Sequence, residues 1–592
     1  MKTFDQDHTL PSLPVPELQA TCAAVPELVA PLVDSPTLAA THAALEEFSR
    51  PGGPGELLQS ALRDRQSALP GNASWLRPFW DDMYLSWRGT LPLDMNYCFR
   101  FDERRWGGDT ALARLTHALG AALSALHREE LAPEQTKAGF LSMDQARTCL
   151  YTRIPGHNQD TLLPVAAGGP RSIAVTCQGH WFVLPLLFDG DQAASVPALQ
   201  TAFAAIRREA AQFSPSAPVA AMTGASREDA ASLRAELCEG LQNRVSLSAL
   251  EQSLFVVCLD PPHASDDDLI RKILAGDAAS RWFDKSLQII ATENGGLGAN
   301  FEHAGCDAAI WVHLFGQADK AILSGLDGPD ADPAPVARDH AAYRVLRWEA
   351  AENADRRLEE LCREFDERAQ GLDIVCRDFS DFSRETLKSL GTSPDAFLQT
   401  AFQVAQHKIF GRPRSSYEAV SVRGFAQGRT ECARGSSGDA LAFALALQKD
   451  TSPEKLLDLY RQAERAHKAR MVRCQRGLGV ERHMYGLKAM YTLYGKALGL
   501  EHEPAVFSDP GWLTLKHDAL STSGIGAPFI RFFGFGPVVE DGFGIGYAPG
   551  PDATGLVVTS WKNAHAASAF TSAFERAASA LAGLLRSALP SD

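Results

Sequence analysis

The chain has 592 residues, of which 45% are hydrophobic and 22% are charged. Because a single hydrophobic core rarely grows beyond about 300 residues, this length predicts at least two domains. The formal net charge of −15 argues against nucleic acid or an anionic membrane surface as the main partner. A phosphate-bearing ligand would therefore need a local basic patch.

The spacing of the cysteines and the lack of long apolar runs indicate whether the protein binds a metal and in which cell compartment it works. The 11 cysteines are dispersed and form no C-x-x-C pair, so we predict no metal site and no dithiol redox site. The segment 1–14 has neither an apolar core nor an Arg-rich pattern, and no apolar run approaches the ~18 residues of a membrane span. We expect a cytoplasmic protein in a reducing environment.

The first 150 residues are predicted to be mainly helical, with a turn at 51–55 where Pro and Gly cluster. Strands mixed with helices are expected after that point, because short apolar runs alternate with longer periodic ones. The elements predicted in this half are helices over 15–48 and 111–126, strands over 173–177 and 182–188, a helix over 193–212 and a strand over 254–259.

A charged helix over 350–367 is expected to link two domains, residues 1–350 and 351–592. Ser393, Pro394 and Asp395 have the order of an N-cap, a first helical residue and an acidic first turn, so a helix should begin there. Both halves mix strands and helices, which predicts an α/β protein of two layered domains. The other elements predicted in the second half are a strand over 417–422, a helix over 453–476, strands over 529–533, 544–547 and 556–561, and a helix over 564–589.

The segment NFEHAGCD, residues 300–307, lies between apolar runs at 287–290 and 308–314. We expect a turn between two buried strands, with His303 held away from bulk solvent. Histidine ionises near neutral pH, so a residue held in this way can act as a general base, and Asp307 could orient its ring. A buried histidine beside a capping aspartate would show the same pattern, so the segment alone leaves the choice open.

A series of motifs runs through nearly the whole chain: LPSLPVPELQ (10–19), RIPGHNQD (153–160), RWFDKSLQ (281–288), NFEHAGCD (300–307), YEAVSVRGFAQGRTECAR (417–434), STS (521–523) and FGPVVED (535–541). Each is short, but in this order they resemble the carnitine/choline acyltransferase family, and within it the pattern is most similar to carnitine O-acetyltransferases. The resemblance implies two chloramphenicol-acetyltransferase-like domains. Each is a mixed β-sheet flanked by helices, with an active-site tunnel at the interface.

The resemblance also implies the catalytic groups. His303 matches the general base, Asp307 is a structural support for it, and the hydroxyl of Ser523 faces the oxyanion. Acyl transfer in the family is direct, without an acyl-enzyme. Cys306 is only three residues from His303, which is poor geometry for a Cys–His dyad, so we do not expect a cysteine nucleophile.

Coenzyme A is expected as a co-substrate, and no permanently bound cofactor is expected. Arg384 and Lys388 are four residues apart, so they would share one face of a helix. Without the resemblance they would be read as an ordinary solvated face. By resemblance they contact the 3′-phosphate of coenzyme A, and Asp395 lies near the nucleotide end.

The acceptor site is implied by Tyr417, Thr430 and Arg482. In carnitine transferases a Tyr and a Thr bind the acceptor carboxylate and an Arg attracts it, whereas choline acetyltransferases lack that Arg. Arg482 therefore favours carnitine. Ser521 is assigned to the same substrate site, and Phe535 to a cation–π contact with the trimethylammonium group.

Some positions depart from the family pattern or bear on acyl length. Ala419 and Cys432 replace a serine and a threonine, and a lost hydrogen bond to a charged group costs about 1.5–3 kcal/mol. Weak carnitine binding, or a different amino-acid-like acceptor, therefore stays open. Phe533 stands where a bulky residue closes the acyl pocket, which predicts short acyl groups. A shift of the register by one residue would put Gly534 there and reverse that prediction.

The sequence thus predicts reversible transfer of a short acyl group between coenzyme A and carnitine. The enzyme is expected to be a monomer that acts on small molecules. One alternative is transfer to choline or another hydroxylated acceptor. The other is a catalytically silent acyl-CoA-binding protein, which the intact His303 and Ser523 disfavour.

Overall fold

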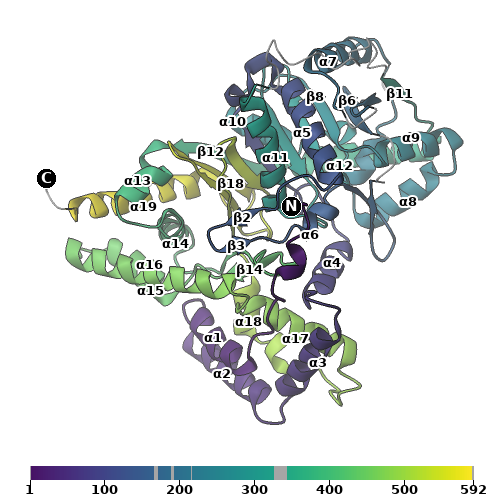
Figure 1. Ribbon diagram of the computed structural model, residues 1–592. Coiled ribbons are helices and arrows are strands. Elements are labelled where there is room, and N and C mark those ends of the chain that lie inside the picture. Colours follow the sequence, from purple (N-terminus) through teal and green to yellow (C-terminus); the bar gives the residue numbers. More distant parts are fainter. Residues whose placement is uncertain (1, 166–170, 189–191, 215, 326–342, 590–592) are drawn as a thin grey trace.

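Two mixed β-sheets form the framework of the protein (Figure 1). The computed structural model describes residues 2–165, 171–188, 192–214, 216–325 and 343–589. Within these residues the first sheet has eight strands, in the order β11 (Arg344–Leu346), β7 (His180–Pro185), β6 (Ser172–Cys177), β8 (Val256–Asp260), β9 (Gln288–Thr292), β10 (Leu297–Phe301), β1 (Tyr97–Phe101) and β16 (Ile530–Phe535). The second has six in the same described ranges, in the order β12 (Leu372–Phe379), β18 (Thr554–Trp561), β17 (Phe543–Pro549), β15 (Leu520–Gly524), β13 (Ser416–Ser421) and β14 (Thr430–Ala433).

The two sheets share one pattern of strand pairing. In the first sheet β6, β8 and β9 run parallel, with antiparallel β7 on one side and β10 and then β1 on the other. In the second sheet β13, β15 and β17 run parallel, with β14 on one side and β18 and then β12 on the other. Corresponding strands also follow the same chain order when the edge strands β11 and β16 are set aside. The repeat confirms the predicted α/β fold of two similar domains.

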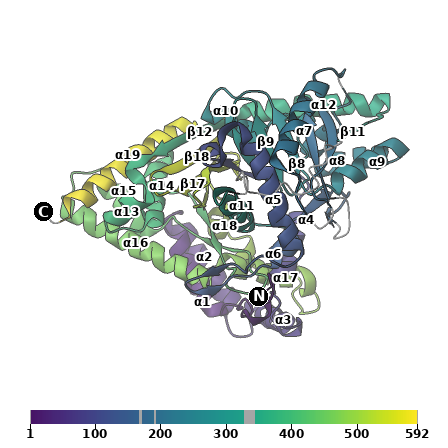
Figure 2. The ribbon, with the colours of Figure 1, turned by 45° about the horizontal axis from the view of Figure 1, so that its top comes forward.

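Helices cover the sheets and are held by shared apolar clusters (Figure 2). One face of the first sheet packs against α5 (Ala111–His127), α7 (Val196–Ala210) and α11 (Ala308–Leu323). The other face packs against α8 (Arg227–Leu237), α9 (Leu241–Glu251), α10 (Asp266–Leu274) and α12 (Glu352–Gly371). The second sheet packs against α14 (Pro394–Phe410), α15 (Gly438–Leu447), α16 (Pro453–Gln475) and α19 (Ala567–Ser587). Ile374, Cys376 and Val557 of the second sheet belong to the second of these clusters, so the two halves share buried apolar surface.

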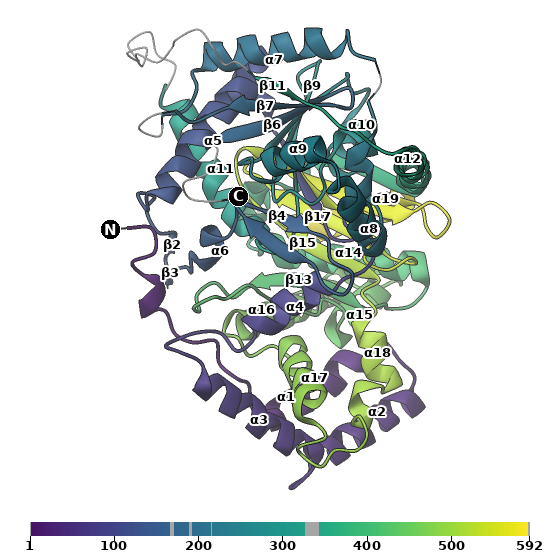
Figure 3. The same ribbon diagram turned by 90° about the vertical axis from the view of Figure 1, so that its right-hand side faces the viewer.

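Two segments cross the predicted division between residues 1–350 and 351–592. Strand β16 comes from the second half of the chain but pairs with β1 at the edge of the first sheet. Conversely, the N-terminal helices join one apolar cluster with α17 (Glu481–Tyr494) and α18 (Pro510–Lys516), and Figure 3 shows them together beyond the sheets. They are α1 (Leu18–Val29), α2 (Ser35–Ser49) and α3 (Pro54–Ala68). The division itself stays a prediction.

Local sequence signals located several elements correctly. The predicted linking helix is α12, and α14 begins after Ser393, whose Oγ accepts a hydrogen bond from the main-chain N–H of Ala396 at 3.4 Å. One expectation is wrong, because the apolar run 308–314 starts helix α11 and not a strand. A short apolar run does not distinguish the two. Helix is favoured here because Asp307 takes the N-cap position and buried side chains recur at helical spacing through the run and beyond.

The mainly helical first 150 residues also contain β1, which their pattern did not single out. All five residues of β1 are buried, so the alternation that identifies half-exposed strands is absent. None of the helices in the described part of the chain combines the length and the apolar character that crossing a bilayer requires.

Candidate active site

A cavity of about 540 Å³ lies where both sheets and helix α4 (Arg77–Leu85) meet. It brings together nine of the residues predicted from sequence: His303, Asp307, Tyr417, Thr430, Arg482, Ser521, Ser523, Phe533 and Phe535. These residues are spread over positions 303–535 of the sequence, so the cavity is a product of the tertiary fold.

His303 follows β10 and is half-buried between aromatic rings. Its ring centroid lies 5.2 Å from that of Tyr84 and 4.9 Å from that of Tyr97. Its Nδ1 lies 3.3 Å from the main-chain oxygen of Cys306. A carbonyl oxygen can only accept, so this contact assigns the proton to Nδ1 and makes Nε2 the proton acceptor of the neutral ring. Burial lowers the pKa of His303, so the ring is neutral at neutral pH and suited to act as a base.

Asp307 is held by Arg429 and Gln145 at the start of α11. Its Oδ1 accepts hydrogen bonds from Nη2 and Nε of Arg429 at 2.7 and 3.1 Å, and its Oδ2 accepts one from Gln145 at 3.1 Å. Burial alone would raise the pKa of Asp307, but Arg429 outweighs it and the pKa is lowered. Oδ1 is 3.8 Å from Nδ1 of His303. A carboxylate engaged in this way favours a supporting role over proton transfer.

Arg429 also fixes the turn that carries the histidine. Its guanidinium donates to the main-chain oxygens of His303 at 2.9 Å and Ala304 at 2.5 Å. Cys306, in the same turn, is fully buried, and burial raises the pKa of its thiol well above the usual value. A thiol that resists ionisation is a poor nucleophile, which agrees with the sequence-based expectation.

A buried ion-pair network anchors the other side of the turn. Glu302 accepts hydrogen bonds from Arg153 at 2.9 Å and from the Tyr151 hydroxyl at 2.5 Å. Arg153 in turn donates to Asp160 at 2.7 Å. Three of these side chains are fully buried in ion pairs, so the motif 153–160 serves to hold the turn rigid from behind.

Strands β13 and β15 form the opposite wall. Successive side chains of a strand point to opposite faces, so Ser521 and Ser523 share the cavity face of β15. Thr522, between them, is fully buried and hydrogen-bonded: its hydroxyl donates to the Tyr417 main-chain oxygen at 2.8 Å and accepts from Gln399 at 2.9 Å. The central residue of Ser-Thr-Ser therefore fixes the strand, and the outer two present hydroxyls.

Arg482, in the first turn of α17, reaches the same wall. Its Nη2 donates to the Tyr417 hydroxyl at 3.0 Å and its Nε to the Thr430 main-chain oxygen at 3.2 Å. Burial raises the pKa of Tyr417 to about 12, so this partner is neutral. Among the described residues no carboxylate oxygen lies within 4.0 Å of its guanidinium. The other two arginines of the cavity, Arg423 and Arg429, pair with carboxylates at 2.7 Å.

Strand β16 resolves the register left open by the sequence. Phe533 and Phe535 both line the cavity, with ring centroids 5.4 Å apart. Gly534 faces the other side of the sheet, because a Cβ added there would lie 3.1 Å from Val557 Cγ1 and 3.4 Å from Cys98 Sγ. Phe533, and not Gly534, is therefore the residue that limits the cavity at this point.

The three residues predicted to bind coenzyme A are not part of the cavity lining. Arg384 and Lys388 lie on the short helix α13 (Arg384–Ser389), where Arg384 is half-buried and Lys388 is exposed, and both contact Glu385, at 3.1 and 3.4 Å. The helix puts them on one face, as expected. Asp395 lies at the start of α14 and accepts a hydrogen bond from the Tyr547 hydroxyl at 2.8 Å.

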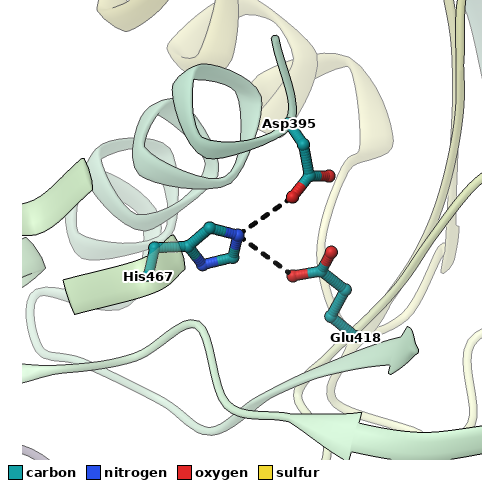
Figure 4. Close-up of side chains that lie close together, drawn as sticks. All are labelled: Asp395, Glu418 and His467. Carbon is teal, nitrogen blue, oxygen red and sulfur yellow. Dashed lines mark hydrogen bonds and ion pairs between the residues drawn. The ribbon is translucent and has the colours of Figure 1, made fainter. Parts of the chain in front are cut away.

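Asp395 is half-buried and forms a polar group with two buried residues, His467 and Glu418 (Figure 4). The Nε2 atom of His467 lies 3.0 Å from Asp395 and 3.6 Å from Glu418. Burial, and then the charge of Asp395, raise the pKa of Glu418 well above its usual value, so the pair retains one proton. Tyr547 packs against Gly524 at the end of β15, so this group lies behind the strand that carries Ser523.

The sequence did not single out five side chains that build the site: Trp80, Tyr84, Tyr97, Gln145 and Arg429. Arg429 lies inside the motif 417–434, directly before Thr430. Its position in that motif is the sequence signal that could have identified it as a residue of the site. Trp80 and Tyr84 are four residues apart on α4, a spacing that puts two aromatic rings on one helix face but does not reveal what they face.

Comparison with known proteins places the chain in a family. The model described as "Choline/Carnitine o-acyltransferase" matches residues 13–576. Choline O-acetyltransferase of Sus scrofa is 28% identical over 590 residues, covering 94% of this chain and 89% of that protein. Carnitine O-acetyltransferase of Rattus norvegicus is 30% identical over 566 residues, covering 91% of this chain and 87% of that protein.

Among solved structures, trichothecene 15-O-acetyltransferase from Fusarium sporotrichioides aligns with a TM-score of 0.33 at 11% identity. The alignment covers 56% of this chain and 76% of that chain, and a similarity this low supports no argument about the site. The family match spans nearly the whole chain. The chain therefore belongs to the choline/carnitine O-acyltransferase family, in which an acyl group is transferred between coenzyme A and a hydroxylated acceptor.

Proposed function

We propose that this enzyme transfers a short acyl group reversibly between coenzyme A and the hydroxyl of carnitine. The choice of carnitine as acceptor rests on the surroundings of Arg482. This residue lines the cavity, and among the described residues no carboxylate oxygen lies within 4.0 Å of its guanidinium. Arg482 is half-buried, and a cation that loses part of its hydration without a counter-ion is costly. An acceptor that supplies a carboxylate is therefore favoured over one that brings only positive charge.

Glu431, the carboxyl that acts most strongly on the Arg482 charge, does not change this balance. Glu431 accepts a hydrogen bond from the main-chain N–H of Arg482 at 3.3 Å, and burial raises its pKa to about 7. It is therefore only partly ionised at neutral pH and its charge offsets that of Arg482 incompletely. In the proposed complex the acceptor carboxylate lies against Arg482 and the hydroxyls of Tyr417 and Thr430.

The proposed chemistry needs one base and one oxyanion donor. Nε2 of His303 takes the proton from the carnitine hydroxyl while the oxygen of that hydroxyl attacks the thioester carbonyl carbon. The tetrahedral oxyanion is stabilised by the hydroxyl of Ser523. When the C–S bond breaks, the sulfur takes the proton back from His303 and leaves as free coenzyme A. A positioned base contributes about 10²- to 10⁴-fold and one oxyanion donor about 10²- to 10³-fold.

The other predicted site residues complete the proposed complex. Ser521 and Phe535 lie along the acceptor, with the Phe535 ring toward the trimethylammonium group. Phe533 limits the acyl group to short chains. Arg384 and Lys388 bind the 3′-phosphate of coenzyme A, and Asp395 lies near the nucleotide end. Asp307 supports His303 and takes no proton.

Thiol release from acetyl-, octanoyl- and palmitoyl-CoA, with and without L-carnitine, tests the proposal. We expect release with acetyl-CoA that requires both carnitine and His303, so that His303→Ala abolishes it. Arg482→Met should raise the KM for carnitine at least tenfold, since one charged hydrogen bond is worth about 1.5–3 kcal/mol. Equal activity of Arg482→Met and the wild type toward carnitine would overturn the acceptor assignment.

Choline is the second candidate acceptor, because choline O-acetyltransferases are as similar to this chain as carnitine O-acetyltransferases are. It has no carboxylate, so its turnover should not depend on Arg482. Release of thiol with choline and not with carnitine would establish this alternative. Binding of acetyl-CoA without turnover of any hydroxylated acceptor would instead support a silent acyl-CoA-binding protein.

A further inference from the structure

Helix α4 presents two aromatic side chains to the cavity, and both contact charged groups of the site. The guanidinium carbon of Arg482 lies 4.1 Å from the ring centroid of Trp80, and that of Arg429 lies 5.8 Å from it. Arg429 also lies 4.9 Å from the Tyr84 ring, which is 5.2 Å from the ring of His303. The indole of Trp80 is thus in contact with both cavity arginines that flank the reacting groups.

We propose that Trp80 is a positioning residue whose indole separates the two guanidinium groups and holds Arg482 in the orientation that binds the acceptor. The inference rests on the proposed function, which assigns Arg482 to the acceptor carboxylate. Two like charges at a partly buried site repel each other more strongly than they would in bulk water. An aromatic face attracts both and keeps them apart at the same time.

The two arginines depend on Trp80 to different degrees. Arg429 is fixed by its two hydrogen bonds to Asp307 and by two main-chain oxygens of the His303 turn. Among the described residues, the hydrogen-bond partners of the Arg482 guanidinium are neutral: the Tyr417 hydroxyl and the Thr430 main-chain oxygen. Loss of the indole should therefore release Arg482 and leave Arg429 nearly in place, so binding of the acceptor carboxylate is affected before the base is.

The side chain of Trp80 is itself well fixed. Its residue is 3% exposed and its ring packs edge-to-face against Tyr84 at 6.0 Å. Phenylalanine at this position would keep an aromatic face of smaller area, whereas leucine would keep apolar volume without one. The pair Trp80→Phe and Trp80→Leu therefore separates the aromatic contact from simple packing.

A matched control lies two residues after the end of the same helix. Trp87 is 40% exposed, lies outside the cavity lining and donates its indole N–H to the main-chain oxygen of Thr90 at 3.0 Å. The test compares Trp80→Leu, Trp80→Phe and Trp87→Leu with the wild type by the KM for carnitine, the KM for acetyl-CoA and kcat. We expect Trp80→Leu to raise the carnitine KM about threefold to thirtyfold, the range of a cation–aromatic contact, with the acetyl-CoA KM unchanged. Trp80→Phe should recover part of that loss, and Trp87→Leu should behave as the wild type.

A double-mutant cycle with Arg482→Met decides whether Trp80 acts through Arg482. If it does, Trp80→Leu has no further effect on the carnitine KM once Arg482 is replaced. Additive effects of the two substitutions, or a Trp80→Leu variant whose acetyl-CoA KM rises as much as its carnitine KM, would overturn the proposal. Failure of the proposed function is seen separately, because the wild type would then show no turnover with carnitine at all.

Discussion

The ion pair between Arg429 and Asp307 gives the sharpest prediction about the catalytic turn. Arg429→Met removes two charged hydrogen bonds to Asp307, at 2.7 and 3.1 Å, and two donors to the main chain of the turn. Among the described residues, this leaves the side-chain amide of Gln145 as the hydrogen-bond donor to the buried carboxylate. Breaking one partner of a buried pair costs about 3–5 kcal/mol, so we expect a loss of that size in the free energy of unfolding, measured in urea.

The same variant should change the pH dependence of the reaction. Burial lowers the pKa of His303 and the Arg429 charge lowers it further, whereas the Asp307 charge raises it. Because a base is active only when deprotonated, kcat/KM falls as the pH drops through the pKa of His303. Removal of Arg429 raises that pKa, so the acid limb of kcat/KM moves to higher pH. The rate at the plateau should fall about 10- to 100-fold, as a displaced base loses part of its contribution.

Two companion variants test the reasoning. Asp307→Asn alone should move the acid limb to lower pH, because only the charge of Arg429 then acts on His303. The double variant Arg429→Met/Asp307→Asn removes both charges, so its stability should exceed that of Arg429→Met and its acid limb should lie near that of the wild type. An Arg429→Met enzyme with unchanged stability and an unchanged acid limb would refute the account of this turn.

Three further predictions follow from other parts of the structure. Phe533→Ala should admit octanoyl-CoA as a substrate. The matched control is Gly534→Ala, whose new Cβ would meet Val557 at 3.1 Å on the other face of the sheet; it should change stability but not the acyl preference. An unchanged acyl preference in Phe533→Ala would show that Phe533 does not limit the acyl chain. Cys306→Ala should keep its turnover, measured by thiol release, because the thiol is not the nucleophile, and complete loss of activity in a folded variant would contradict that. Lys285 is fully buried, and burial lowers its pKa to about 7. Between about pH 7 and 10 this lysine is therefore mostly neutral in the folded protein but protonated in the unfolded chain. Because the unfolded chain binds more protons there, the stability of the wild type rises with pH over this range. The stability of Lys285→Met should not rise in this way. The free energy of unfolding of Lys285→Met minus that of the wild type should therefore be greater at pH 7 than at pH 9 by about 2–3 kcal/mol. If this difference between variant and wild type did not change with pH, Lys285 would not be a neutral lysine in the folded protein.

The sequence motifs identified chemistry better than they identified geometry. The segment 300–307 marked His303 correctly as a residue of the cavity, yet the apolar run after it was expected to be a strand and is α11. The error has a physical cause: a short run of apolar side chains can cover a sheet or fill a helix face, and only packing against the rest of the chain decides between them. Motif 153–160 was noticed for its resemblance, whereas its role as the buried anchor of Glu302 became visible only in three dimensions.

What the sequence determined by itself is the set of local structures with strong signals and the family. Ser393, Pro394 and Asp395 start a helix because capping is a matter of neighbouring residues. The placement of Phe533 on the cavity face depended on the pairing of β16 with β1, which joins residues more than 400 positions apart. The contacts of Trp80 with Arg429 and Arg482 likewise required α4, β14 and α17 to meet. Such contacts depend on long-range packing, which no local pattern of side chains encodes.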